Sequence, residues 1–415
     1  MAANQAGRQM ERISTTCCIA GGGPAGVMAG FLLARAGVRV EVLEKHKDFF
    51  RDFRGDTIHP STLQLMNELG LIEDFLKVPH QKVSSLYFHL GDKRFKLADF
   101  SKLGVRYPYI ALMPQWDFLN FLATKAKRYP GFLLRMETEV TGLIEEEGRV
   151  TGVRAKTPQG EIEIFADLVL GCDGRHSVVR EAAKLAVKEL GAPIDVLWFH
   201  LSRPKSDPEE TMARLGPGHF LVMLNRDDYW QCAFVIHKGG DAELRAKGLE
   251  NFRNEVEKLA PFARGRMQEV KDWDQVKLLT VAVDRLEEWA RRGLLCIGDA
   301  AHAMSPVGGV GINLAIQDAV AAANLLWEPL REKRVTIDDL NAVQKRREFP
   351  TKATQRMQVF VQDNVLKKVL SGTGELKVPW VLRLISSFPL FQQLPAYFVG
   401  VGARPEHIRS PEMKA

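Results

Sequence analysis

The stretch Gly21-Gly-Gly-Pro-Ala-Gly26 decides the fold of this chain. An apolar, β-branched run from Ile13 to Ala20 leads directly into these glycines, and Pro24 to Ala36 has the apolar spacing of a helix that ends at Gly37. Val38 to Leu43 then alternates as a second buried strand does. Together they form one βαβ unit, the context in which a G-x-G-x-x-G pattern indicates dinucleotide binding.

The glycines of this unit have separate tasks in binding a pyrophosphate. Gly21 permits the tight turn, Gly23 lets the backbone approach the phosphates, and Gly26 lets helix and strand pack closely. The helix N-terminus adds free N–H groups and a positive dipole end. We therefore expect the cofactor to contact this turn, which consists of Gly21, Gly23, Pro24, Ala25 and Gly26.

A carboxylate, Glu44, follows Gly26 by eighteen residues. At that place it would accept hydrogen bonds from an adenosine ribose and repel a 2′-phosphate, so FAD or NAD fits better than NADP. A glycine-rich turn without a ligand is the alternative, and the complete βαβ context disfavours it.

A later glycine-bearing stretch favours FAD over NAD. The short apolar run Gly293 to Ile297 leads to Gly298 and Asp299, and we expect Asp299 to hydrogen-bond the sugar-alcohol chain of a flavin. The loop Pro306-Val-Gly-Gly-Val-Gly-Ile-Asn313 then feeds an alanine-rich helix, Leu314 to Leu326.

The start of that helix suits the pyrimidine edge of an isoalloxazine. A reduced flavin is negatively charged there, and a helix N-terminus stabilises negative charge. The predicted contacts are Gly311 and the backbone N–H groups of Ile312 and Asn313. NAD has no use for this second helix end, so the sequence predicts FAD.

These motifs resemble the FAD-dependent aromatic hydroxylases of the para-hydroxybenzoate hydroxylase type, the single-component flavoprotein monooxygenases. The resemblance covers roughly residues 13 to 345 and includes a third motif, Leu170-Gly-Cys-Asp-Gly-Arg-His-Ser-Val-Val-Arg180. In this family that motif is said to serve both FAD and the nicotinamide donor, which implies a cofactor role for Asp173. Cys172 stands where the family more often has alanine, and the last sixty or so residues match nothing in it.

The resemblance also assigns further residues and a reaction. Arg54 looks like the arginine that contacts the flavin and its pyrophosphate, Gln115 like the glutamine that reaches the cofactor chain, and Pro306 like the proline on the reactive flavin face. The implied reaction is hydroxylation of an aromatic or quinone-like small molecule with NAD(P)H and O2 through a flavin C4a-hydroperoxide. The catalytic acid or base stays unknown.

The expected fold class is α/β, with a Rossmann-like FAD-binding domain, an interleaved antiparallel β-sheet substrate domain and a C-terminal helical segment. Val83 to Phe100 alternates as a hairpin turning at Gly91-Asp92, and Ile194 to His200, Phe220 to Leu224 and Tyr229 to Ile236 alternate as antiparallel strands do. The predicted boundaries are 12–79, 106–186 and 280–355 for the FAD-binding domain, 80–105 and 187–279 for the substrate domain, and 356–415 for a C-terminal helical cap.

The C-terminal segment leaves two interpretations open. Val359 to Leu370 is amphipathic and helical, and Pro379 to Phe391 is strongly apolar but holds two prolines within its bounds besides Arg383. Core packing explains most such stripes, which favours a cap on the flavin domain or a dimer surface. The alternative is a hydrophobic lid, or a membrane-surface foot that admits a lipophilic substrate.

Composition excludes several other classes. The chain has 415 residues, 46% hydrophobic and 26% charged, enough for two domains. A net charge of +6 is mild, and Lys345-Arg-Arg347 is interpreted as the solvated face of a helix, so nucleic-acid binding has little support. Five cysteines without a C-x-x-C pair favour a reducing, cytoplasmic location.

Other motifs are missing from the sequence. The ten histidines show no metal-ligand spacing, and His302 is interpreted as a packing or hydrogen-bonding residue. No G-x-S-x-G elbow and no run of eighteen apolar residues occurs, so neither a serine hydrolase nor a membrane-spanning chain is expected.

Three functions remain open at this point. The first is the hydroxylase. The second is a flavin-dependent reductase or halogenase on the same scaffold, although Trp273-Asp-Gln275 lacks the paired tryptophans that such halogenases usually carry. The third is a non-catalytic flavoprotein that serves as a subunit in a biosynthetic complex. Under any of the three, the chain is expected to be a monomer or homodimer.

Overall fold

The N-terminal βαβ unit forms as predicted. The structure, a computed structural model, describes residues 11–50, 57–372 and 385–413. Strand β1 (Glu11–Ala20) enters helix α1 (Pro24–Arg35), and β2 (Val40–Leu43) returns parallel to β1. Cys18 and Ile19 in β1 are wholly buried, because both faces of a parallel sheet are covered.

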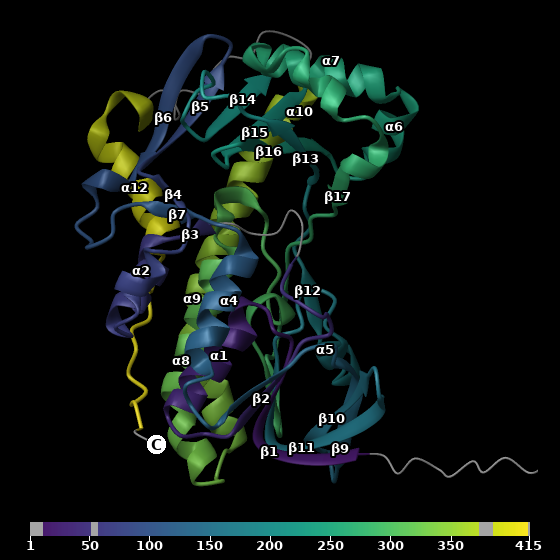
Figure 1. Ribbon diagram of the computed structural model, residues 1–415, viewed down its shortest axis with the longest axis vertical. Helices are drawn as coiled ribbons and strands as arrows, with labels where there is room; N and C mark the ends of the chain where they lie inside the picture. Colours follow the sequence, from purple (N-terminus) through teal and green to yellow (C-terminus); the bar gives the residue numbers. More distant parts are fainter. Residues whose placement is uncertain (1–10, 51–56, 373–384, 414–415) are drawn as a thin grey trace, which may run out of the picture.

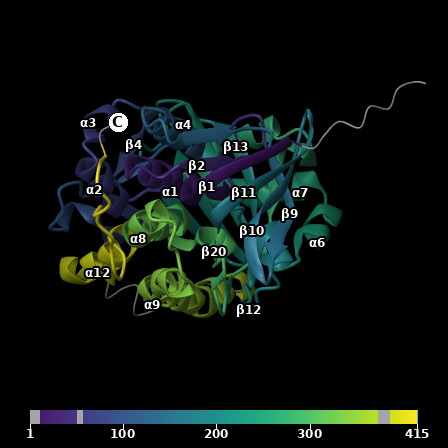
Figure 2. The ribbon, with the colours of Figure 1, turned by 90° about the horizontal axis from the view of Figure 1, so that it is seen from below.

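An eight-stranded sheet is built on this unit at the lower end of the molecule in Figure 1. Its central strands β11, β1, β2 and β8 are parallel, and β20 continues the parallel pairing beyond β11. Helix α1 and helix α8 (Gly311–Arg331) pack beside the sheet, with α9 (Ile337–Val361) next to α8 (Figure 2). The added strands are β8 (Phe132–Arg135), β9 (Glu139–Glu146), β10 (Arg149–Thr157), β11 (Gly160–Gly171), β19 (Ala290–Arg291) and β20 (Leu294–Cys296).

A seven-stranded sheet forms the upper end, in the order β17-β13-β16-β15-β14-β5-β6. Every pairing along it is antiparallel, as predicted, except that β14 lies parallel to β5. Helices α6 (Asp241–Ala246) and α7 (Leu249–Leu259) lie at its outer side, where α7 closes an apolar core. The strands are β5 (Ser85–Leu90), β6 (Lys93–Asp99), β13 (Ile194–Ser202), β14 (Met212–Gly216), β15 (His219–Asn225), β16 (Tyr229–His237) and β17 (Lys277–Leu279).

Short elements connect the two sheets or pack beside them. They carry the chain from one sheet to the other and place cavity residues such as Thr57 and Gln115. These elements are β3 (Thr57–Ile58), α2 (Pro60–Glu68), α3 (Ile72–Phe75), β4 (Gln81–Val83), β7 (Ile110–Leu112), α4 (Gln115–Ala126), α5 (Val178–Ala182), β12 (Val187–Glu189) and β18 (Asp284–Leu286).

Short 3-10 turns complete the connections. They are Phe100–Lys102, Pro261–Ala263, Arg266–Glu269, Trp273–Gln275, Gly298–Ala300 and Val307–Gly309. The last two belong to the predicted flavin motif, where Gly298, Gly308 and Gly309 all have positive φ and so favour glycine.

Two long helices join the ends of the molecule. Helix α8 (Gly311–Arg331) is the predicted alanine-rich helix, and α9 (Ile337–Val361) continues through a π-helical turn (Gln362–Leu366) into α10 (Lys367–Ser371). Figure 1 shows α9 rising from beside the eight-stranded sheet to the seven-stranded sheet. The helix therefore continues without a break through residue 355, where the sequence predicted the end of the FAD-binding domain.

The sequence shows no continuous apolar run long enough for a membrane span, yet one described segment passes a test of length and mean hydropathy. That segment is Val307–Arg331, which includes α8. Within its most apolar window 72% of the residues are buried inside the protein, as in the core helix of a globular domain.

The interpretation of Lys345-Arg-Arg347 as a solvated face is wrong for Arg347. Its side chain is 1% exposed, and it donates to Asp318 at 2.9 Å and to Glu406 at 3.2 Å. Asp318 also contacts His302 at 2.6 Å. The helix turns Arg347 inward because these two buried carboxylates need a cation.

The C-terminal residues return to the half of the molecule that contains the eight-stranded sheet. Helix α12 (Pro389–Gly400) packs against β6, and residues 401–413 then run back beside α8 and α1. The backbone N–H of Met413 donates to the carbonyl of Arg35 at 2.9 Å, and Arg346 pairs with Glu406 at 2.7 Å. Part of the apolar stretch 379–391 lies outside the described residues.

Candidate active site

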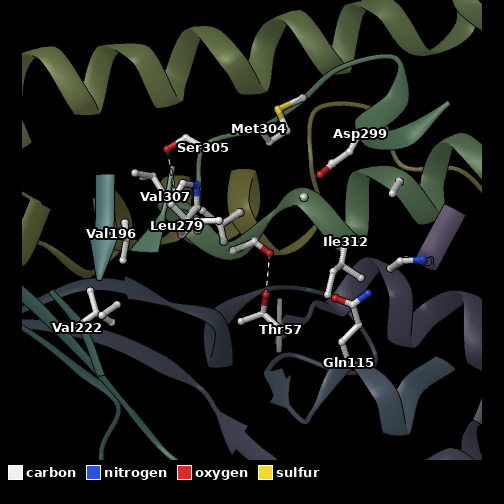
Figure 3. Close-up of a pocket in the computed structure, with 18 of the residues that line it drawn as sticks. Thr57, Gln115, Val196, Val222, Leu279, Asp299, Met304, Ser305, Val307 and Ile312 are labelled. Atoms are coloured by element: carbon white, nitrogen blue, oxygen red, sulfur yellow. Dashed lines mark hydrogen bonds between the residues drawn. The ribbon is translucent and has the colours of Figure 1, made fainter. Parts of the chain in front are cut away.

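One cavity of about 1510 Å³ joins the dinucleotide turn to the seven-stranded sheet. Single-ligand pockets typically measure ~300–1,000 Å³, so there is room for a cofactor and a second molecule. Figure 3 shows Asp299, Ile312 and Gln115 on one side of the cavity, and Val196 and Val222 on the other.

The three motif glycines differ in what surrounds them. A Cβ on Gly26 would lie 1.9 Å from the carbonyl oxygen of Gly21, and one on Gly21 would lie 2.4 Å from that of Cys172. A Cβ on Gly23 would meet no protein atom within 4 Å, because this residue faces the cavity. Open space beside the N-terminus of α1 is what an approaching pyrophosphate needs.

Glu44 lies at the end of β2, directly beside this turn. Its carboxylate accepts from the backbone N–H of Gly22 at 3.1 Å and from that of His46 at 3.1 Å. The side chain is buried and lines the cavity. Glu44 is thus held in place at the edge of the cavity that Pro24 and Ala25 also line, and its contact with a ribose stays a prediction.

The middle motif meets the first at the ends of neighbouring parallel strands. The N–H of Cys172 donates to the carbonyl of Ala20 at 2.7 Å. The Asp173 carboxylate accepts from Ser177 Oγ at 2.5 Å and from the Val179 N–H at 3.1 Å, which orders the start of α5. Burial raises the pKa of Asp173 above its usual range. Asp173 borders the cavity, and its contact with a cofactor stays a prediction.

Gly298 brings the ends of α1 and α8 together. It has a φ of +61°, and a Cβ there would lie 3.1 Å from Ala25 Cβ and 3.2 Å from Ala315 Cβ. The next residue, Asp299, points into the cavity, and its carboxylate lies 3.9 Å from the Arg175 guanidinium. The structure therefore brings the motifs that contain Gly21, Asp173 and Gly298 to a single wall of the cavity.

The start of α8 is fastened to the neighbouring elements through Asn313. Its Oδ1 accepts from the His59 N–H at 2.9 Å and from Thr62 Oγ1 at 2.7 Å, while its Nδ2 donates to the Thr57 carbonyl at 3.1 Å. The first backbone N–H groups of a helix have no intrahelical acceptor. Gly311 and Ile312 line the cavity, so these N–H groups can bind an electron-rich edge there.

Two further predicted residues have different outcomes. Gln115 is the first residue of α4 and lines the cavity on the side of Ile312. Arg54 lies outside the described residues, and its role stays a prediction.

Burial around His59 excludes it as a proton carrier near neutral pH. Burial lowers the pKa of His59 to about 4, although its Nδ1 lies 2.7 Å from the Val399 carbonyl. The ring is therefore neutral, and Nδ1 donates to that carbonyl.

Two glutamines that the sequence did not indicate, one on α9 and one at the start of the π-helical turn after it, hold the loop around Pro306. Gln358 accepts from the Ser305 N–H at 3.2 Å and donates to the carbonyls of Ser305 and Val307, both at 2.9 Å. Gln362 donates to Ser305 Oγ. Pro306, between these anchored residues, lines the cavity. The available signal was a helical repeat of polar side chains: Arg347, Thr351, Gln355, Gln358 and Gln362 are all buried.

The other half of the cavity is mainly apolar. Its walls are the inner face of the seven-stranded sheet, the end of α9 and one side of α12. The side chains that serve the sheet wall alternate along the strands, among them Val196, Phe220, Val222, Ala233 and Val235. Such a surface suits a flat hydrocarbon-rich molecule, because burial of apolar area drives binding.

A family match identifies the kind of ligand that this cavity binds. Residues 14–357 match the family described as FAD binding domain. The chain belongs to that family. It is thus an FAD-binding flavoprotein of the aromatic hydroxylase type, and the predicted resemblance is confirmed.

Relatives of this flavoprotein include several named monooxygenases. It is 31% identical to the 6-methylpretetramide 4-monooxygenase of Streptomyces rimosus over 386 residues, which cover 92% of this chain and 91% of that protein. It is 28% identical to the rifampicin monooxygenase of Streptomyces venezuelae over 316 residues, 75% of this chain and 63% of the relative.

Solved structures share the fold of this flavoprotein at lower identity. The p-nitrophenol 4-monooxygenase PnpA from Pseudomonas putida superposes with a TM-score of 0.75 at 20% identity, covering 95% of this chain and all of that one. PqsL, a probable FAD-dependent monooxygenase from Pseudomonas aeruginosa, has a TM-score of 0.73 at 21% identity over 86% of this chain and 97% of its own. The predicted α/β fold class is confirmed.

Proposed function

We propose that this flavoprotein hydroxylates an aromatic or quinone-like small molecule, using NAD(P)H and O2. The observation that carries the proposal is the single cavity, which runs from the dinucleotide turn to an apolar sheet face. Bound FAD would accept a hydride from NAD(P)H and activate O2 for transfer of one oxygen atom to the ring.

The residues of the chain would bind the cofactor, orient the substrate and exclude water. The turn at Gly23 and Glu44 would hold the adenosine and pyrophosphate end, and Asp299 the sugar-alcohol chain. The helix start at Ile312 would stabilise negative charge on the reduced ring. Pro306 and the apolar sheet face would keep water from the reacting atoms, which favours oxygen transfer over release of peroxide.

The nicotinamide donor would approach the border of the cavity near the dinucleotide turn. Lys45 and Arg175 line that border beside the carboxylates of Glu44, Asp173 and Asp299. These two cations would contact the phosphates of either NADH or NADPH, and they do not select between the two donors.

Cavity size favours a substrate of several fused rings. The named relatives act on 6-methylpretetramide, rifampicin and, more distantly, para-nitrophenol. We infer a polycyclic aromatic substrate, because the apolar half continues under the sheet to α12. Leu394 of α12 lines the cavity and is 67% exposed, so substrate would enter there. Contact of this helix with a membrane surface stays a prediction.

The test is an absorbance spectrum of the purified protein, followed by NADH or NADPH oxidation under air with polycyclic phenols. We expect a yellow protein whose oxidation accelerates with one ring compound and yields a product one oxygen atom heavier. Oxidation without oxygen incorporation would instead favour the reductase, and chloride-dependent product formation the halogenase. A yellow protein that oxidises neither donor would favour the non-catalytic subunit.

A further inference from the structure

One polar side chain interrupts the apolar part of the cavity wall that β15 and β16 form. Along β15 and β16, both fully described, the cavity-lining residues are Phe220, Val222 and Leu224, and then Gln231, Ala233 and Val235. Gln231 is the one among these six with a hydrogen-bonding side chain. It is 4% exposed and pairs with Leu224 in the sheet register.

A hydrogen bond from Arg226 fixes the orientation of the Gln231 amide. The Nε of Arg226, which can only donate, lies 3.0 Å from Gln231 Oε1. The oxygen must therefore face Arg226, and the NH2 group must point the other way. Within the described chain that Nε2 has no hydrogen-bond partner, and Gln231 lines the cavity, so the NH2 group faces the cavity interior.

The surroundings make this NH2 group a selective donor. A guanidinium bound to Oε1 withdraws electron density from the amide, which strengthens Nε2 as a donor. A buried donor without an acceptor costs free energy, whereas an oxygen on the occupant would satisfy it. The neighbouring Thr211 hydroxyl accepts from the Asn225 N–H at 3.2 Å, which holds its oxygen against β15.

We propose that Gln231 determines substrate specificity by donating from Nε2 to a carbonyl or phenolate oxygen on a polycyclic aromatic substrate. This inference rests on the proposed function for the nature of the occupant. A ring system without an oxygen at that edge would leave the amide desolvated and unpaired, and would bind more weakly. Discrimination by loss of a hydrogen-bond partner is stronger than discrimination by apolar size.

The experiment compares two ligands of one shape, 9-fluorenone and fluorene, which differ in a carbonyl against a CH2 group. Binding to the FAD-loaded protein is measured by tryptophan fluorescence or by perturbation of the flavin absorbance, so no turnover is needed. We expect fluorenone to bind the wild type roughly tenfold more tightly than fluorene, the size of one good hydrogen bond.

Two variants of similar side-chain size test the assignment. Gln231→Met removes the donor and should bring the fluorenone-to-fluorene affinity ratio to about one, with fluorene binding changed less than about twofold. Gln231→Glu keeps a partner for Arg226 but presents an acceptor to the cavity, so fluorenone should bind more weakly than fluorene. Gln64→Met on α2, outside the cavity, should keep the wild-type ratio.

Three outcomes overturn the inference: equal affinities in the wild type, a ratio unchanged in Gln231→Met, or no binding of either ligand. Thermal melts of all variants show whether the fold is kept, and Gln231→Glu supplies a second measurement if Gln231→Met fails to fold. Failure of the proposed function looks different. In that case FAD-loaded protein would discriminate the ligands normally but oxidise no nicotinamide donor.

Discussion

At the scale of single residues, the glycines of the dinucleotide turn have separable roles. Gly26 is packed against backbone at a distance no side chain can occupy, while Gly23 opens onto the cavity. The close packing predicted for Gly26 is confirmed, because the βαβ context dictates where a helix must approach a strand, whereas the phosphate contact of Gly23 stays a prediction. The sequence could not predict the free space around Gly23, because residues from other motifs bound that space.

Gly23→Val should fold and remain colourless. The added side chain meets no protein atom at its Cβ, so stability of the apoprotein should change by less than about 1 kcal/mol. It would occupy the space for the pyrophosphate, so FAD should not bind. Flavin absorbance and a denaturant melt check both statements. Gly26→Val is the matched comparison and should fail to fold, since its Cβ would overlap Gly21. A yellow Gly23→Val protein would contradict this placement of the cofactor.

The buried charges around Asp318 provide a second residue-scale prediction. Burial alone would raise the pKa of Asp318, but His302 and Arg347 outweigh it and hold that pKa below its usual range. Arg347→Met should therefore destabilise the protein by about 3 kcal/mol, because it removes one charged partner from each of two buried carboxylates, while Asp318 keeps His302 and Glu406 keeps Arg346. Urea unfolding measures the loss. Lys345→Met, on an exposed position of the same helix, should change stability by less than about 0.5 kcal/mol.

At the scale of elements, the sequence predicted local structure well and distant pairing poorly. Alternation identified the hairpin of β5 and β6 and the antiparallel strands β13, β15 and β16. It could not reveal that β14 lies parallel to β5, because that contact joins residues more than a hundred positions apart. The grouping of these segments into domains stays a prediction.

The burial of Arg347 on helix α9 could not be predicted for a related reason. Apolar residues alone do not mark the buried face of α9, because polar and charged side chains that contact other parts of the chain continue it beyond Leu340 and Val343. Arg347 was consequently placed in solvent, although its partners lie 29 and 59 residues away. Sequence spacing alone cannot identify such partners.

Gln358→Leu should loosen the loop that carries Pro306. The change leaves the Ser305 N–H and two carbonyls without their partner, at a cost of about 2–4 kcal/mol in stability. We also expect a weaker affinity for FAD and a shifted flavin circular dichroism spectrum. Arg356→Leu is the control, since that side chain is exposed on the same helix. Identical flavin spectra in wild type and Gln358→Leu would show that the glutamine does not position this loop.

At the scale of the whole molecule, the cavity is bounded by both sheets, so cofactor and fold should be linked thermodynamically. A ligand that binds only the native state stabilises it by about 2.7 kcal/mol at a concentration one hundred times its dissociation constant. Removal of FAD should lower the melting temperature, and added FAD should restore it in proportion to the logarithm of its concentration. Added AMP, which lacks the flavin, should restore less. A melting temperature independent of FAD would contradict the proposed site.

The path of α9 between the two sheets limits how such proteins can be recombined. The strands around the substrate come from two separate stretches of chain, and a third stretch, the helix itself, closes the same space. A chimera that takes the strands from a relative but retains the resident helix would join surfaces that never coevolved. Exchange of substrate range therefore needs coordinated crossovers in all three stretches, whereas point substitutions on the strand face need none. We therefore expect the substrate range of this pocket to change mainly through point substitutions on the strand face.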